Sequence, residues 1–287
     1  MTEHAEVLRY AAFTTEPEGG NPAGVVLDAT GLHDAAMQDI AAAVGYSETA
    51  FLTPSGRAGR YEVRYFSPLA EVPFCGHATV AASVALAEHV GPGELTFLTP
   101  VGEVPVVVRQ ADDGGPVATL SSVEPHQEPV AVADLAEALA ALDWSAGDLD
   151  PALPPLIAFA GARHLVLAAA GRKRLAALDY DFDRLRDLML RLDLTTLQLV
   201  WRESPTVFHV RDPFPVGGVV EDPATGAAAA ALGGYLRELG LVPPTTTLTL
   251  HQGHDLGRPS LLTVELRAGD PRVHVTGAAV RIPYGTP

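Results

Sequence analysis

Two segments of the chain are apolar almost all round when wound as helices, and they constrain the fold more than any other feature. The first runs from Ala78 to about Val90, and the second follows Asp222 in the run PATGAAAAALGGYL. A helix without a polar face must be enclosed by the rest of its domain. Each segment follows an expected strand and a short polar turn. The sequence therefore predicts two central helices, each wrapped by β-sheet.

The two segments also resemble each other. Residues 76–82 (GHATVAA) can be laid over residues 222–228 (DPATGAA), because both contain an Ala-Thr step before an Ala-rich run. This internal similarity predicts a pseudo-repeat of two lobes. Coincidence in an Ala-rich chain is the alternative interpretation.

Strand and helix patterns mix along the rest of the chain without regular βα alternation. This mixture favours an α+β fold over a Rossmann or TIM pattern, and neither GxGxxG nor GxxxxGK[ST] occurs. Residues 34–44 and 182–192 have helical spacing, and Gly45 is expected to end the first of these helices. A Pro-, Glu- and Ala-rich stretch at about 124–134 is interpreted as a linker between two lobes.

The composition and net charge of the chain limit the classes of molecule that it can bind. A net charge of −16 argues against nucleic acid and against an anionic membrane surface. The sequence has one cysteine, no basic-then-apolar leader and no uncharged apolar run of about 18 residues, so we expect a cytoplasmic protein without disulfides. A small carboxylate substrate is compatible with the acidic charge, because unpaired N–H groups at two helix starts can bind an anion without basic side chains.

Three ionisable residues are candidates for catalysis. Glu48 lies between a helix end and a strand and is either a general acid/base or a solvated or capping side chain. His77, at a helix start, is either a proton relay or a capping or packed histidine. Asp222 is either a carboxylate aimed into a cleft or an N-cap, and the preceding Glu221 forms an acidic pair with it.

Other chemistries have weaker support. The histidines are scattered, with no HExxH and no paired cysteines, so no metal site is predicted. No GxSxG elbow supports a serine hydrolase. Cys75, beside Gly76-His77, is a candidate for a thiol nucleophile or for one ligand of a metal ion.

Five motifs in order resemble the PhzF-like isomerases, a family with the diaminopimelate epimerase fold. They are GNPAGVV at 20–26, SETAF at 47–51, YFSPLAEVPFCGHAT at 65–79, EDPATGA at 221–227 and QGHDLGRPS at 252–260. The resemblance implies two pseudo-symmetric lobes, each a rolled sheet around a buried helix, with the active site between them. The expected lobes are residues 1–122 with 270–287 returning to them, and residues 123–269.

The resemblance also implies roles for residues. Glu48 would transfer the proton, and His77 and Asp222 would assist it; no cofactor and no metal would be needed. The expected substrate-contacting positions are Asn21, Gly76, Gly226 and Ala227. The implied reaction is a double-bond shift in a small carboxylate such as a dihydro-hydroxyanthranilate, and a homodimer is the expectation from the family.

Two departures from the family pattern bear on the substrate. Ala227 stands where the phenazine enzyme has Ser, so a hydroxyl contact is missing. Cys75 matches one thiol of the diaminopimelate epimerases, but the other aligns at Pro223, which excludes a two-thiol racemase. Two alternatives stay open: an epimerase or lyase that uses Cys75 alone, and a binding protein without catalytic activity. Cys75 itself is interpreted as a packed residue at the cleft wall.

Overall fold

The structure, a computed structural model, describes residues 5–111 and 114–283. The chain divides into two compact units: unit 1 is Met1–Ser121 with Thr276–Pro287, and unit 2 is Ser122–Val275. Two parts of the sequence predictions lie outside the described residues. They are residues 1–4, where no leader peptide was expected, and residues 284–287, the end of the segment expected to return to the first lobe. In the described part, no helix has the length and apolar character needed to cross a membrane.

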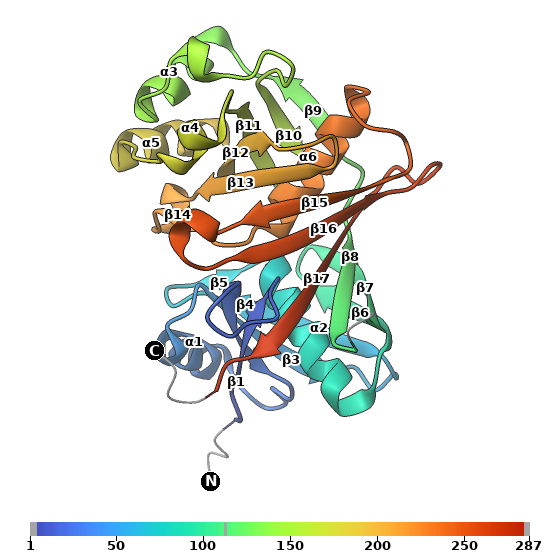
Figure 1. Cartoon of the computed structure of the whole chain (residues 1–287). Coiled ribbons are helices and arrows are strands. Elements are labelled where there is room, and N and C mark those ends of the chain that lie inside the picture. Colours follow the sequence, from blue (N-terminus) through green and yellow to red (C-terminus); the bar gives the residue numbers. More distant parts are fainter. Residues whose placement is uncertain (1–4, 112–113, 284–287) are drawn as a thin grey trace. The chain divides into compact units, whose positions relative to one another are not determined.

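Unit 1 is a closed sheet around a helix (Figure 1). Each of its main strands pairs with the next in the order given below, and the last pairs back with the first. The order is β1 (Leu8–Ala12), β2 (Asn21–Val26), β3 (Glu48–Pro54), β4 (Arg60–Phe66), β6 (Gly93–Thr99), β7 (Gly102–Gln110), β8 (Pro116–Ser121) and β17 (Val273–Arg281). A short strand, β5 (Glu71–Val72), also pairs with β4.

The central helix of unit 1 is α2 (Gly76–Val90). Its residues from His77 to Ala87 are all buried, and it packs against β1, β2, β3, β7 and β8. The second helix, α1 (Asp34–Val44), places Met37 and Ala41 against Phe51 of β3 and ends at Gly45 with a φ of 72°. The predicted bounds of α1 and its glycine end are confirmed.

Unit 2 repeats this pairing scheme. Its strands pair in the order β9 (His126–Pro129), β10 (Leu156–Phe159), β11 (Arg163–Ala168), β12 (Thr196–Arg202), β13 (Val207–Pro213), β15 (Thr246–Gln252) and β16 (Ser260–Leu266). A short strand, β14 (Glu221–Asp222), pairs with β13. The stretch 124–134, predicted as a linker, contains β9. That prediction was wrong because Glu and Pro, which are poor strand formers, are tolerated on so short a strand.

The central helix of unit 2 is α6 (Gly226–Glu238), which packs against β9, β10, β11 and β16. A Cβ at Gly234 would lie 2.4 Å from Cβ of Pro125, so glycine lets this helix approach the chain closely. Other helices of unit 2 bury leucines in a second core. These helices are α3 (Val132–Ala141), α4 (Arg172–Ala176) and α5 (Phe182–Leu192), the last with the predicted bounds. The remaining helical turns are Ala146–Asp148, Pro215–Gly217 and His254–Leu256.

The register of the short strands identifies equivalent residues in the two units. Glu71 of β5 stands opposite Phe66 of β4, and Glu221 of β14 stands opposite Pro213 of β13. In both units the central helix then begins five residues after the glutamate. The repeated motif is therefore Glu-x-Pro-x-x-Gly, at 71–76 and 221–226.

The predicted pseudo-repeat is thus confirmed in topology, but the predicted alignment was wrong by four residues. Gly76 is equivalent to Gly226 and not to Asp222. The shared Ala-Thr step misled the alignment, because it lies inside the first turn of α2 but just before α6.

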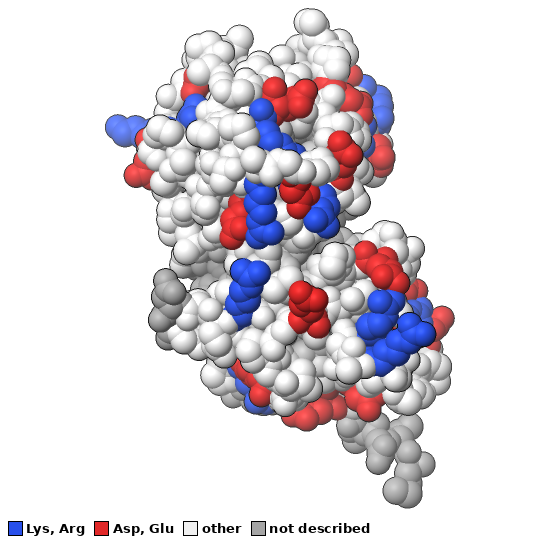
Figure 2. Space-filling view, turned by 90° about the vertical axis from the view of Figure 1, so that its right-hand side faces the viewer, with Lys and Arg blue, Asp and Glu red and all other residues white. Residues whose placement is uncertain are grey.

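Charged side chains are interspersed on the face drawn in Figure 2, where Lys and Arg lie among Asp and Glu. A phosphate backbone requires clustered basic side chains. On this face the basic side chains have acidic ones near them.

Candidate active site

The start of α2 places His77 in the interior of unit 1. Cys75 caps the helix in an extended conformation, and its carbonyl oxygen accepts hydrogen bonds from the backbone N–H of Thr79 (3.0 Å) and from Oγ1 of Thr79 (2.6 Å). His77 is therefore the second helical residue and not the cap. Only 6% of its surface is exposed.

Two strands bring polar side chains to the same helix start. Asn21 is the first residue of β2, and Glu48 is the first residue of β3. The two strands run parallel, with Ala23 opposite Glu48. Because parallel strands begin at the same edge of a sheet, both side chains reach the first turn of α2.

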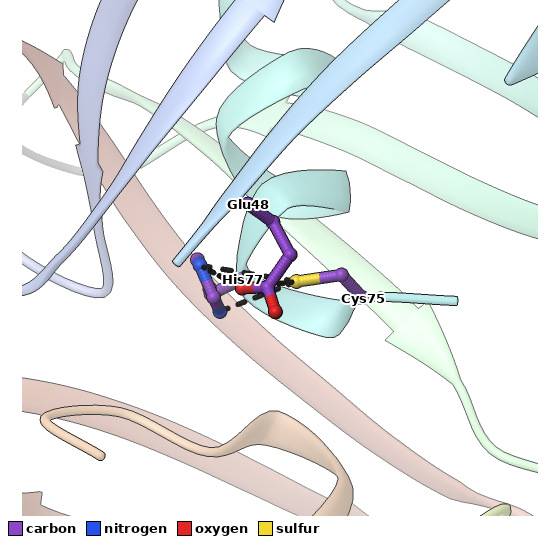
Figure 3. Close-up of side chains that lie close together, drawn as sticks. All are labelled: Glu48, Cys75 and His77. Carbon is purple, nitrogen blue, oxygen red and sulfur yellow. Dashed lines mark hydrogen bonds and ion pairs between the residues drawn. The ribbon is translucent and has the colours of Figure 1, made fainter. Parts of the chain in front are cut away.

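The result is a compact cluster of Glu48, Cys75 and His77 (Figure 3). Oε2 of Glu48 lies 3.3 Å from Nε2 of His77, and Sγ of Cys75 lies 3.5 Å from that carboxylate oxygen. The sulfur is also 3.3 Å from Nδ1 of His77. Cys75, expected to be a packed residue, is buried, and it also contacts both expected catalytic residues of this unit.

Asn21 and Ser47 orient the imidazole. Nδ2 of Asn21 lies 3.1 Å from Nδ1 of His77, and Oγ of Ser47 lies 3.3 Å from Nε2. An amide N–H donated to Nδ1 leaves the ring proton on Nε2, where it points at the carboxylate of Glu48. Ser47 was not predicted, although its place beside Glu48 in SETAF was a signal.

The remaining predicted residues lie in unit 2, at the start of α6. The cap of α6 is Thr225, so the N-cap alternative for Asp222 is wrong. Oγ1 of Thr225 donates a 2.5 Å hydrogen bond to Oδ2 of Asp222, and the backbone N–H of Thr225 donates to Oε1 of Gln252 (3.0 Å). Gly226 is the first helical residue, and Ala227, half-buried, is the second.

Asp212 is a buried acid that sequence reasoning missed. It stands opposite Asp222 across the β13–β14 pair, and Nε2 of Gln252 donates to its Oδ2 at 3.2 Å. Burial, with the nearby charges of Asp222 and Glu221, raises the pKa of Asp212 well above its ordinary value. No motif marks this residue, because its burial depends on strand pairing.

Glu221 has a different role from the one expected of an acidic pair. The guanidinium of Arg211 donates to both of its oxygens, from Nε at 3.0 Å and from Nη2 at 2.5 Å. Both side chains are buried. Glu221 is therefore half of a buried ion pair that holds β14 against β13.

Comparison with known proteins agrees with this geometry. Residues 10–285 match the family described as "Phenazine biosynthesis-like protein". The trans-2,3-dihydro-3-hydroxyanthranilate isomerase of Pseudomonas fluorescens is 32% identical over 281 residues, covering 96% of each chain.

Solved structures give the same result. A PhzF-family phenazine biosynthesis protein from Bacillus anthracis superposes with a TM-score of 0.87 at 27% identity and 96% coverage of both chains. A probable proline racemase from Agrobacterium radiobacter, with a TM-score of 0.65 at 13% identity, covers 96% of this chain and 90% of its own; this likeness concerns the fold alone and confirms the epimerase-like architecture. The chain therefore belongs to the phenazine biosynthesis-like, or PhzF, family of isomerases.

Proposed function

We propose that the protein is a cofactor-independent isomerase that moves a proton between two carbons of a small unsaturated carboxylate, with Glu48 as the proton carrier. The contact between Glu48 and His77 is the observation that carries this proposal. Their side chains are 16% and 7% exposed, and their polar atoms are 3.3 Å apart. A carboxylate held by a buried imidazole, in a family of isomerases, suits acid/base work.

The proposed step balances without a co-reactant. The Glu48 carboxylate accepts a proton from a C–H next to an activating group, and the electron pair enters the conjugated system. The resulting carboxylic acid of Glu48 exchanges its proton with solvent and then delivers a proton to a distant carbon, so the double bond shifts and the composition is unchanged. General acid–base help of this kind contributes about 10²–10⁴-fold.

The neighbouring groups have supporting roles in this proposal. His77, oriented by Asn21, holds the carboxylate of Glu48 in place. The backbone N–H groups in the first turn of a helix attract anions, so Gly76, at the start of α2, is assigned to binding the substrate carboxylate. Asp222, fixed by the hydroxyl of Thr225, is the acid that the family resemblance assigns to the reaction.

The substrate class follows from the relative's activity. A dihydro-hydroxyanthranilate-like acid has a carboxylate and a conjugated ring, which are the two features that the step requires. Ala227 has no hydroxyl to offer, so we propose a related acid as the natural substrate and dihydro-hydroxyanthranilate as the first compound to test.

The test is solvent exchange. In D₂O, the wild-type protein should incorporate deuterium into the product of trans-2,3-dihydro-3-hydroxyanthranilate, as followed by NMR. Glu48→Gln should abolish incorporation while the acid still raises the melting temperature. Glu62→Gln, an exposed glutamate on the neighbouring strand β4, is the matched control. Incorporation by Glu48→Gln at the wild-type rate would remove Glu48 from the role, and binding without turnover by wild type would favour a binding protein.

A second candidate is an epimerase or lyase in which Cys75 moves the proton. The distance of 3.5 Å from its Sγ to Oε2 of Glu48 favours it. Cys75→Ala distinguishes the two: under the main proposal deuterium incorporation continues, whereas under the thiol version it stops together with turnover.

A further inference from the structure

The cluster at the start of α2 combines three kinds of metal-binding group. Glu48 offers a carboxylate, Cys75 a thiol and His77 an imidazole (Figure 3). Across residues 5–111 and 114–283, no other set of three or more His, Cys, Asp or Glu side chains brings its ligand atoms within 4.8 Å of one another. The sequence did not predict this set of three ligands, because Glu48 is 27 residues before Cys75.

The spacing of the ligand atoms fits one cation. Oε2 of Glu48 and Nε2 of His77 are 3.3 Å apart, and Sγ of Cys75 is 3.5 Å and 3.8 Å from them. Zinc bonds of about 2.3 Å to sulfur and about 2.0–2.1 Å to nitrogen and oxygen, at tetrahedral angles, place ligand atoms about 3.4 Å (N to O) and about 3.6 Å (S to N or O) apart. The triangle therefore needs only small side-chain shifts to become one face of a zinc tetrahedron.

The surroundings provide the second shell that such a site needs. A cation on Nε2 moves the ring proton of His77 to Nδ1, beside the amide of Asn21 at 3.1 Å. A flip of that amide presents its oxygen as the acceptor, and such a partner fixes the ring and strengthens the ligand. A thiolate and a carboxylate together neutralise a divalent charge, and a water molecule or a small anion would supply the fourth ligand.

We propose that Glu48, Cys75 and His77 form a site for a thiophilic divalent cation, best suited to Zn²⁺, and that its occupation inhibits the enzyme. Inhibition follows because the cation takes the carboxylate oxygen of Glu48 that would accept the substrate proton. The inhibitory part rests on the proposed function, whereas the binding itself does not.

Cobalt provides a test of binding that does not depend on turnover. One equivalent of Co²⁺ added to the whole protein under reducing conditions should give visible bands of a four-coordinate ion and a near-ultraviolet thiolate-to-cobalt band, both displaced by Zn²⁺. Cys75→Ser should lose the thiolate band and at least about 10-fold in affinity. Asn21→Leu should keep the band and bind about 10–100-fold more weakly, as second-shell losses do. Thermal unfolding confirms that each variant is folded.

The rival site for such a metal in unit 2 supplies the control. His209 and His251 stack at 5.0 Å, and His254 lies 5.3 Å from His251, measured between ring centroids. His251→Ala should leave the cobalt spectrum unchanged. A wild type without the thiolate band, or bands that persist in Cys75→Ser and vanish in His251→Ala, would overturn the proposal.

Inhibition is measured separately from metal binding, by deuterium incorporation. Stoichiometric Zn²⁺ should stop deuterium incorporation, and EDTA should restore it. Zinc that binds without affecting incorporation would refute the inhibitory part. If Glu48→Gln proves active, the proposed function fails, but the cobalt spectrum still decides whether the site exists.

Discussion

The starts of α2 and α6 rest on the same strand pairing but carry different chemistry. In unit 1 the helix opens with Cys75, Gly76 and His77; in unit 2 the equivalent run is 225–227, Thr-Gly-Ala. Glu48, the first residue of β3, has Thr196, the first residue of β12, as its counterpart. Unit 1 therefore holds the imidazole and its carboxylate partner, whereas unit 2 has acids on β13 and β14.

The same comparison extends to an ion pair at equivalent positions. Arg64 donates two hydrogen bonds to Glu71, at 2.7 and 2.6 Å, as Arg211 does to Glu221. The pair in unit 1 has side chains 33% and 36% exposed, and the pair in unit 2 has side chains 10% and 1% exposed. One geometry thus repeats in two dielectric environments, which decide its energetic weight.

The most direct test of the comparison replaces a residue of unit 1 by the residue at the equivalent position of unit 2. His77→Ala reproduces Ala227 at the equivalent position and removes the partner of Glu48. We expect kcat/KM for dihydro-hydroxyanthranilate to fall by about 10²-fold or more. Turnover above half of the wild-type value would show that the imidazole has no part in the reaction.

The next effect concerns stability. Glu221→Gln leaves Arg211 as an unpaired buried charge and should lower the free energy of unfolding by about 3–5 kcal/mol. Glu71→Gln removes the exposed equivalent and should cost about 0–1 kcal/mol, because solvent screens that pair. Urea unfolding of both variants measures the difference. Equal losses would mean that burial does not separate the two pairs.

A smaller effect depends on pH. His164, equivalent to Ala23 of unit 1 by strand register, is fully buried, and burial lowers its pKa to about 3 from the ordinary 6.5. Below pH 6.5 the unfolded chain binds a proton that the folded chain does not, so stability is lost as the pH falls from 6.5 toward 3.

His164→Ala removes this term. The stability advantage of wild type over the variant should shrink by about 2 kcal/mol between pH 7 and pH 5. Urea unfolding at both pH values measures it, and titration of the other histidines cancels in the comparison. An advantage independent of pH would contradict the assignment to His164.

The smallest expected effect is at the start of α6. Ala227→Ser restores the hydroxyl of the phenazine enzyme, and one added hydrogen bond of about 1 kcal/mol should raise kcat/KM for dihydro-hydroxyanthranilate by about 5-fold. Steady-state kinetics measures the change. An unchanged kcat/KM would show that this position does not contact that substrate.

Much of the fold was predictable because its signals are local. The apolar character of α2 and α6 on every side required two enclosed helices, and helical spacing with a terminal glycine predicted α1 to the residue. Strand β9 was missed because its composition is that of a loop. Its pairing with β10 comes from the neighbouring strand and not from its own propensity.

The candidate site was also predictable only in part from the sequence. The family motifs SETAF, GHAT and GNPAG are local sequence patterns, so the resemblance they carry was enough to select Glu48, His77 and Asn21 as candidates. Only the tertiary structure decided that Cys75 contacts two of them, since the register of β2 with β3 and the first turn of α2 set those distances. It also decided that Asp212 and Glu221 are buried. Burial depends on which strands pair across the sheet, and no local pattern records it.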